Sequence, residues 1–181
     1  VHYLSFELYN KCEGKSENER WELLRSYFFE QKKFQVLSSQ WPEVQEGDLL
    51  MKPVLEKNIG HPLPLTLLYL HLALATNLPV SLVQARQEYI LKWVRPGCSS
   101  YLDMKTGLIL SDCEIFQMLQ KSSSNPEVWD ARLIYRRYLE ELMRLYEQLG
   151  HAQMLHSIYN LCLQLDDANL PVLARRALLR H

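Results

Sequence analysis

One stretch constrains the fold more than any other: residues 60–79, which read GHPLPLTLLYLHLALATNLP. Pro62 stands near its start, and proline is favoured in a first helical turn because its missing N–H would lack a helical partner there. Leucines then occupy nearly every side, and a helix that is apolar all round belongs inside a domain. Asn77 and Pro79 predict its end. The run falls short of the ~20 apolar residues of a membrane span. It therefore predicts the buried central helix of a soluble domain.

Composition narrows the class of protein. With 181 residues, the chain is long enough for one domain, or for one domain with a helical appendage. Its 48% hydrophobic content is typical of a globular protein and argues against disorder. A net charge of −1 provides no overall field that would attract nucleic acid or an anionic membrane.

The four cysteines are widely scattered and form no CxxC pair. This pattern favours reduced thiols in the cytoplasm or nucleus over a disulfide framework or a zinc site, and we expect no metal and no cofactor. Because the sequence starts at Val1 without a methionine, we expect it to be a fragment of a longer polypeptide.

Before the central stretch, the pattern predicts three helices. The first spans residues 1–12, and a capping box of Ser16 and Glu19 begins a second that runs to about Lys33. Residues 34–47 are predicted to form a loop. Asp48 is expected to cap the third helix, which Pro53 would kink and which would end near residues 58–60.

After the central stretch, the pattern changes to strands. Residues 80–94 form strand-like runs, and residues 101–103 and 108–110 predict a hairpin. Ser111 or Asp112 would cap a short helix. The polar run of residues 121–125 is the predicted domain boundary.

The C-terminal part predicts a helical hairpin. Asn125 and Pro126 are expected to begin an amphipathic helix that Gly150 ends. A second helix, up to about Leu165, and the start of a third, at residues 172–179, would follow. Two amphipathic helices joined by one glycine-containing turn resemble one helical repeat.

Three runs carry a more specific resemblance: LRSYFFEQKKFQ at residues 24–35, VLEKNIGHPLPLTLLYLHLALATNLP at 54–79, and YLDMKTGLILS at 101–111. Together they look like the SirB1 family, which has a papain-like transglutaminase core and a tetratricopeptide-like tail. The resemblance implies a mostly helical α+β fold. A small antiparallel sheet would pack on the central helix in a transglutaminase-like domain of residues 1–121, and residues 126–181 would form the helical-repeat-like region.

The resemblance also implies a degenerate catalytic site. The family's cysteine falls on Pro62 and its histidine on Glu88, and only the aspartate is kept, as Asp103. Proline has no nucleophilic atom, and glutamate beside aspartate would bring two like charges together. We therefore expect no catalytic residues.

The main hypothesis is a non-enzymatic protein-interaction module that acts as a scaffold or adaptor for another protein or peptide. A similar unit occurs in an animal F-box protein, which suggests substrate recruitment in a ubiquitin-ligase or nuclear complex. The candidate partner-binding residues are His61, Glu88, Trp93, Tyr101, Arg132 and Arg136.

Two alternatives stay open. One is a hydrolase or transferase that reassigns Glu88, Asp103, His61 or Cys98 to catalysis; the simpler interpretation of His61 is a solvent-exposed cap residue. The other is nucleic-acid binding through the C-terminal arginines. Glutamates lie between these arginines at helical spacing, which favours an ion-paired, solvated helix face instead.

Overall fold

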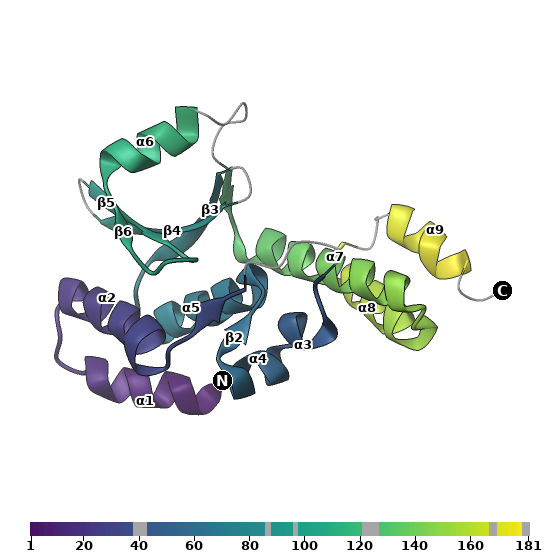
Figure 1. Ribbon diagram of the computed structural model, residues 1–181, viewed down its shortest axis with the longest axis horizontal. Helices are drawn as coiled ribbons and strands as arrows, with labels where there is room; N and C mark the ends of the chain where they lie inside the picture. The colour runs from purple at the N-terminus through teal and green to yellow at the C-terminus, as the bar shows by residue number, and fades with distance from the viewer. Residues whose placement is uncertain (38–42, 86–87, 96–97, 121–126, 167–169, 179–181) are drawn as a thin grey trace.

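The computed structural model describes residues 1–37, 43–85, 88–95, 98–120, 127–166 and 170–178 (Figure 1). The helices are α1 (His2–Cys12), α2 (Glu17–Ser26), α3 (Glu46–Leu49), α4 (Met51–Lys57), α5 (Pro62–Ala75), α6 (Asp112–Gln120), α7 (Ala131–Leu149), α8 (Ala152–Leu165) and α9 (Leu170–Leu178). A π-helical turn, η1 (Tyr27–Gln31), follows α2. The strands are β1 (Gln35–Val36), β2 (Ile59–Gly60), β3 (Val80–Ala85), β4 (Glu88–Arg95), β5 (Cys98–Asp103), β6 (Ile109–Leu110) and β7 (Glu127–Trp129).

The central helix is α5, as predicted. Pro62 is its first residue, and most of its side chains are buried. The helix ends at Thr76, whose hydroxyl donates to the Leu72 and Ala73 carbonyls, and Asn77 takes the left-handed conformation with φ of 54°. An apolar helix surrounded by other elements thus organises the core.

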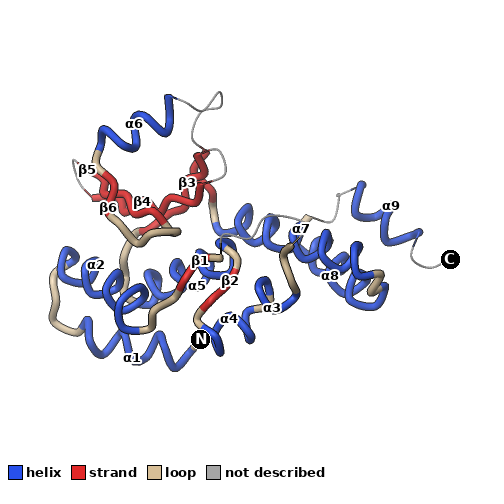
Figure 2. The backbone as a smooth tube through the Cα atoms, viewed as in Figure 1, coloured by secondary structure: helices blue, strands red, loops and turns tan. Residues whose placement is uncertain are grey.

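A five-stranded antiparallel sheet lies above α5, with strand order β6-β5-β4-β3-β7 (Figure 2). Its inner face packs into the main core with α2 and α5 through Leu82, Leu91, Trp93, Leu102 and Trp129. Its outer face carries a smaller cluster in which Ile90 meets Ile115 of α6. The predicted α+β class, the strands and the β5–β6 hairpin are therefore confirmed.

The N-terminal half departs from prediction after α2 and in the loop that follows. The capping box of Ser16 and Glu19 is present, but after α2 the chain forms the π turn, in which the Lys32 N–H donates to the Tyr27 carbonyl at 2.9 Å. The predicted loop contains β1, which pairs with β2 in parallel. Sequence periodicity does not reveal this pair because each strand has only two residues.

The third predicted helix is two short helices. Asp48 lies inside α3, where its carboxylate accepts from the Gln45 N–H, and α4 begins after it. Pro53 therefore falls in the first turn of α4, where proline needs no kink. The predicted end is confirmed, because Asn58 closes α4 with φ of 56°.

The start of the C-terminal helix was also predicted wrongly. Glu127–Trp129 form strand β7, which pairs with β3, and Asp130 caps α7 by accepting from the Leu133 N–H at 2.7 Å. Asn125, Pro126 and the predicted boundary lie outside the described residues, so the division into two domains stays a prediction.

Two tyrosines fasten helix α7 to α3. Tyr138 donates to the Leu49 carbonyl at 2.8 Å, and Tyr146 donates to the Glu46 carboxylate at 2.5 Å. Both partners belong to α3. Among the described helices, none combines the length and the apolar character needed to cross a membrane.

Candidate functional site

The start of α5 is the first candidate site. His61 is the N-cap, and its Nδ1 accepts from the Leu63 N–H at 3.3 Å. The backbone N–H of His61 donates to the Asp48 carbonyl at 2.8 Å. The cap position is as predicted, but the side chain is half-buried instead of solvent-exposed. Burial lowers the pKa of His61 to about 4, although Asp48 opposes the shift. The imidazole is therefore neutral at pH 7, with one nitrogen already engaged by the helix.

This environment makes His61 a source of acid sensitivity. Because its folded-state pKa of about 4 lies below the usual 6.5, its stabilising contribution is complete above pH 6.5. This contribution should decline as the pH falls from 6.5 to about 4, because in this range His61 binds a proton in the unfolded chain but not in the folded protein. Urea unfolding at pH 7 and pH 5 measures the effect. His61→Asn keeps an oxygen acceptor at the cap, so it should lose less stability between these pH values than the wild type. Equal losses would contradict the prediction.

Asp103, the predicted orienting aspartate, is engaged within its own turn. Its carboxylate accepts from the Lys105 N–H at 2.9 Å and from the Thr106 hydroxyl at 2.7 Å. It lies opposite Ile90 in the β4–β5 pair, on the outer face of the sheet, whereas α5 packs on the inner face. Glu88 opens β4 and pairs with Ala85. The described contacts therefore place Asp103 and the start of α5 in separate hydrogen-bond networks.

Of the two aromatic candidates on the sheet, Trp93 was predicted wrongly. It is 2% exposed and stacks on Trp21 with ring centroids 5.1 Å apart, so it belongs to the core and not to a partner surface. Tyr101 is half-buried on the outer face, and the Lys92 ammonium lies 5.8 Å from its ring centroid. Trp93 and Tyr101 lie on opposite faces because their positions along β4 and β5 differ in parity.

The four thiols are free, and they differ in exposure. Cys98, at the start of β5, is exposed, as is Cys113 on α6. Cys12 and Cys162 are buried, and burial raises the pKa of both thiols. In the described part of the chain, no three His, Cys, Asp or Glu side chains gather as a metal site would require.

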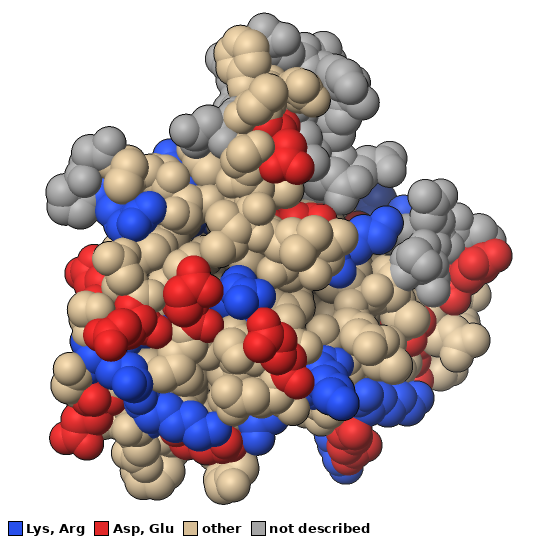
Figure 3. Space-filling model, turned by 60° about the vertical axis from the view of Figure 1, so that its left-hand side comes forward, with Lys and Arg blue, Asp and Glu red and all other residues tan. Residues whose placement is uncertain are grey.

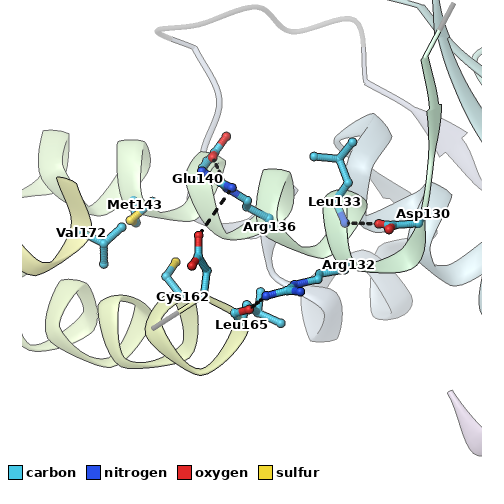
Figure 4. Close-up of a pocket in the computed structure, with 10 residues that line it drawn as sticks. Asp130, Arg132, Leu133, Arg136, Glu140, Met143, Cys162, Leu165 and Val172 are labelled. Atoms are coloured by element: carbon cyan, nitrogen blue, oxygen red, sulfur yellow. Dashed lines mark hydrogen bonds and ion pairs between the residues drawn. The ribbon is translucent and has the colours of Figure 1, made fainter. Parts of the chain in front are cut away.

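A second candidate site lies in the C-terminal helices, where a pocket of about 350 Å³ opens between α7, α8 and α9 (Figure 4). Apolar and polar side chains line different parts of it. The apolar residues are Leu133, Met143, Cys162, Leu165 and Val172, and the polar ones are Asp130, Arg132, Arg136, Glu140 and Asp166. Two predicted partner-binding residues, Arg132 and Arg136, thus come together at one pocket.

Both arginines are held in place by neighbouring groups. Arg136 pairs with Glu140 at 3.2 Å and, across the pocket, with Asp166 at 4.0 Å (Figure 4). Arg132 donates to the Leu165 carbonyl in the last turn of α8, where backbone carbonyls lack helical partners. Reasoning from the sequence found the two arginines but missed the pocket. Its apolar walls come from three helices, and in the sequence their apolar residues cannot be distinguished from residues that pack in the core.

Two further arginines of the C-terminal helices form ion pairs with glutamates of α7, the kind of contact that the interleaved glutamates predicted. Arg137 pairs with Glu140 at 2.9 Å, and Arg175 pairs with Glu147 at 3.1 Å. Acidic and basic side chains are also interspersed over the face shown in Figure 3. Pairs of this exposed kind contribute little to stability, and they reduce the net positive charge available to a phosphate backbone.

Comparison with known proteins gives one result. The model of the transglutaminase-like superfamily matches residues 4–153, which run from α1 into the first turn of α8. The match includes the central helix, the whole sheet and α7. No curated protein and no solved structure matches the chain.

Proposed function

This chain belongs to the transglutaminase-like superfamily, and from that premise we propose that it is a non-enzymatic protein-interaction module. We place it with the SirB1-like members whose catalytic site is degenerate. In this proposal the chain acts in the cytoplasm or nucleus as a scaffold or adaptor within a larger protein. It would recruit another protein or peptide, as a substrate-recruiting subunit of a ubiquitin-ligase or nuclear complex does.

The observation that carries the proposal is the start of α5. A thiol nucleophile at a helix N-terminus needs a sulfur atom there and a basic imidazole beside it. The first helical residue is Pro62, and the neighbouring His61 is neutral and bonded to the Leu63 N–H. Asp103 is engaged by its own turn. These contacts favour a structural function for all three residues.

The pocket between α7, α8 and α9 supports the claim that this chain binds a partner protein. Partner sites commonly join apolar anchor pockets to a few charged groups that set orientation. Here the apolar wall holds Met143, Cys162 and Val172, and Arg136 reaches across from the polar side. We propose this pocket as the contact surface, in preference to the surroundings of Trp93, which is buried.

The test is affinity capture with quantitative mass spectrometry, followed by calorimetric titration with the purified partner. Arg136→Glu should weaken that binding at least ~10-fold, because it reverses a charge at the pocket and removes the ion pair across it with Asp166. Lys52→Glu is the control. Lys52 is also an exposed cation, on α4 and outside the pocket, so its reversal should leave the affinity unchanged.

Other outcomes would overturn the proposal. A partner whose affinity responds equally to both variants would not use the pocket. An enzyme would be revealed if Cys98, the thiol of the enzyme alternative, reacted far faster with iodoacetamide than Cys113, which is also exposed. A nucleic-acid binder would shift an oligonucleotide on a gel, and this shift would weaken steeply with salt.

A further inference from the structure

Helix α9 is held against α7 and α8 by weak contacts. It lies at the end of the molecule remote from the sheet (Figure 1) and adds Val172 to the wall of the pocket. Val172 is buried. A second anchor is the ion pair of Arg175 with Glu147 of α7 at 3.1 Å, and these two side chains are 56% and 41% exposed. Ion pairs as exposed as this one contribute little to stability, so the pair adds little to the hold on α9.

The fit of α9 to its surroundings is also incomplete. The Nε atom of Arg176 is buried and has no hydrogen-bond partner in the described part of the chain, and a buried donor without an acceptor is destabilising. The pocket of about 350 Å³ stays open beside Val172, although well-packed interiors leave few voids larger than a water molecule. Helix α9 therefore occupies this site without filling it.

The contacts of α9 show which chemistry the site accepts from a helix. Val172 and Arg175 are three residues apart on α9, and Met143 and Glu147 are four apart on α7, so each pair lies on one side of its helix. Val172 lies next to Met143 in the pocket wall (Figure 4), and Arg175 meets Glu147. The site thus matches an apolar side chain followed, one helical turn later, by a cation.

We propose that the partner presents a helix of this kind, and that this helix takes the place of α9 on α7 and α8. The inference deepens the proposed function and rests on it. The partner's apolar residue would pack against Met143 and Cys162, and its lysine or arginine would pair with Glu147. An amphipathic helix that lays its apolar side into a pocket between helices is a common mode of recognition. Helix α9 is then an autoinhibitory competitor, and the partner binds only the fraction of molecules in which α9 has left.

A labelled peptide of residues 170–181 serves as the probe, and fluorescence anisotropy measures its binding to the full chain. In the wild type α9 competes with the peptide. Val172→Asp should release α9, because it places a carboxylate against an apolar wall that also holds Glu140 and Asp166. This variant should bind the peptide at least ~10-fold more tightly than the wild type does, which corresponds to an α9 that is seated at least about 90% of the time.

A milder variant guards against unfolding. Arg175→Glu in the full chain places a carboxylate against Glu147 and should also raise the affinity for the peptide, by less than Val172→Asp does. Circular dichroism verifies that both variants are folded. Equal affinities of the wild type and both variants would overturn the proposal, as would the absence of binding by all three up to about 500 µM.

Changes in the peptide test the two contacts. A peptide with Val172→Asp should lose binding to the opened chain, whereas one with Ala177→Asp should keep it. Ala177 is exposed on α9, and the two peptides carry the same net charge. Glu147→Arg in the opened chain should weaken binding of the wild-type peptide, and a peptide with Arg175→Glu should restore it. Equal binding of the two aspartate peptides, or no restoration, would contradict the proposed contacts.

The partner itself separates this inference from the proposed function. Val172→Asp should bind the partner at least ~10-fold more tightly than the wild type does, since α9 no longer competes. A partner whose affinity falls with Arg136→Glu but does not rise with Val172→Asp would overturn the inference about α9 and support the proposed function. Capture of the peptide by Val172→Asp, together with a partner that ignores the pocket, would support a displaceable α9 and overturn the proposed function.

Discussion

Replacing Trp93 with alanine is expected to lower the free energy of unfolding by about 3–5 kcal/mol, the usual cost of truncating a buried large aromatic residue. Trp93 is 2% exposed and stacks on Trp21, which in turn meets Tyr69 of the central helix edge to face, with ring centroids 6.3 Å apart. The Arg95 guanidinium covers the Trp93 ring, with its central carbon 4.5 Å from the ring centroid. The substitution thus opens a cavity where the sheet, α2 and α5 meet.

Urea unfolding followed by circular dichroism measures this loss, and two variants serve as controls. Trp93→Phe keeps an aromatic ring against Trp21 and should cost clearly less. Phe116→Ala removes a ring that is 59% exposed on α6 and should change stability by less than ~0.5 kcal/mol. If Trp93→Ala cost no more than Phe116→Ala, Trp93 would be a surface residue, and it would again be a candidate for partner binding.

Gly107→Ala is expected to destabilise the protein by about 2–5 kcal/mol, more than the same change at Gly14. Both glycines have φ of +71°, where any L-residue costs about 1–2 kcal/mol. A Cβ at Gly14 would meet nothing within 4 Å, so Gly14→Ala should cost only that amount. A Cβ at Gly107 would lie 2.7 Å from Phe29 Cγ. Forcing extra volume into a packed site typically adds about 1–3 kcal/mol.

The clash can be separated from the backbone strain with a double variant. Phe29→Leu should recover part of the stability lost in Gly107→Ala, since the shorter side chain leaves room for the new methyl group. The same Phe29→Leu change should give no recovery in a Gly14→Ala background. Thermal unfolding of the six proteins in the two cycles measures the coupling. Equal costs of the two glycine substitutions would show that Phe29 does not rest against the turn between β5 and β6.

Local signals predicted much of the secondary structure. Pro62, the leucine run and Asn77 specify α5, and Ser16 with Glu19 specifies the start of α2. Gly150 ends α7 in the left-handed conformation, as expected of a residue without a Cβ. These features depend on neighbours in sequence, through caps and hydrophobic periodicity, so the sequence contains the necessary information.

Predictions failed where a distant partner decided the conformation. Residues 127–129 follow a proline and precede a helix, yet they form a strand because β3 offers an edge for pairing. The two-residue strands β1 and β2 exist only through each other. Along the apolar face of α7, Tyr138, Leu142 and Leu145 are buried, but Tyr135 is 37% exposed and Leu149 48%, because α8 and the core cover only part of that face.

The sequence by itself determined the buried central helix and the presence of Pro62 at the first position of α5, because residue identity and short-range periodicity suffice for these. The α+β class followed from the family resemblance of the sequence. Only the tertiary structure decided that Trp93 faces the core, that Asp103 closes its own turn, and that Arg132 and Arg136 lie at a pocket. The reason is physical: the face that a side chain occupies, and the group that it meets there, depend on strand register and on helices that are distant in sequence.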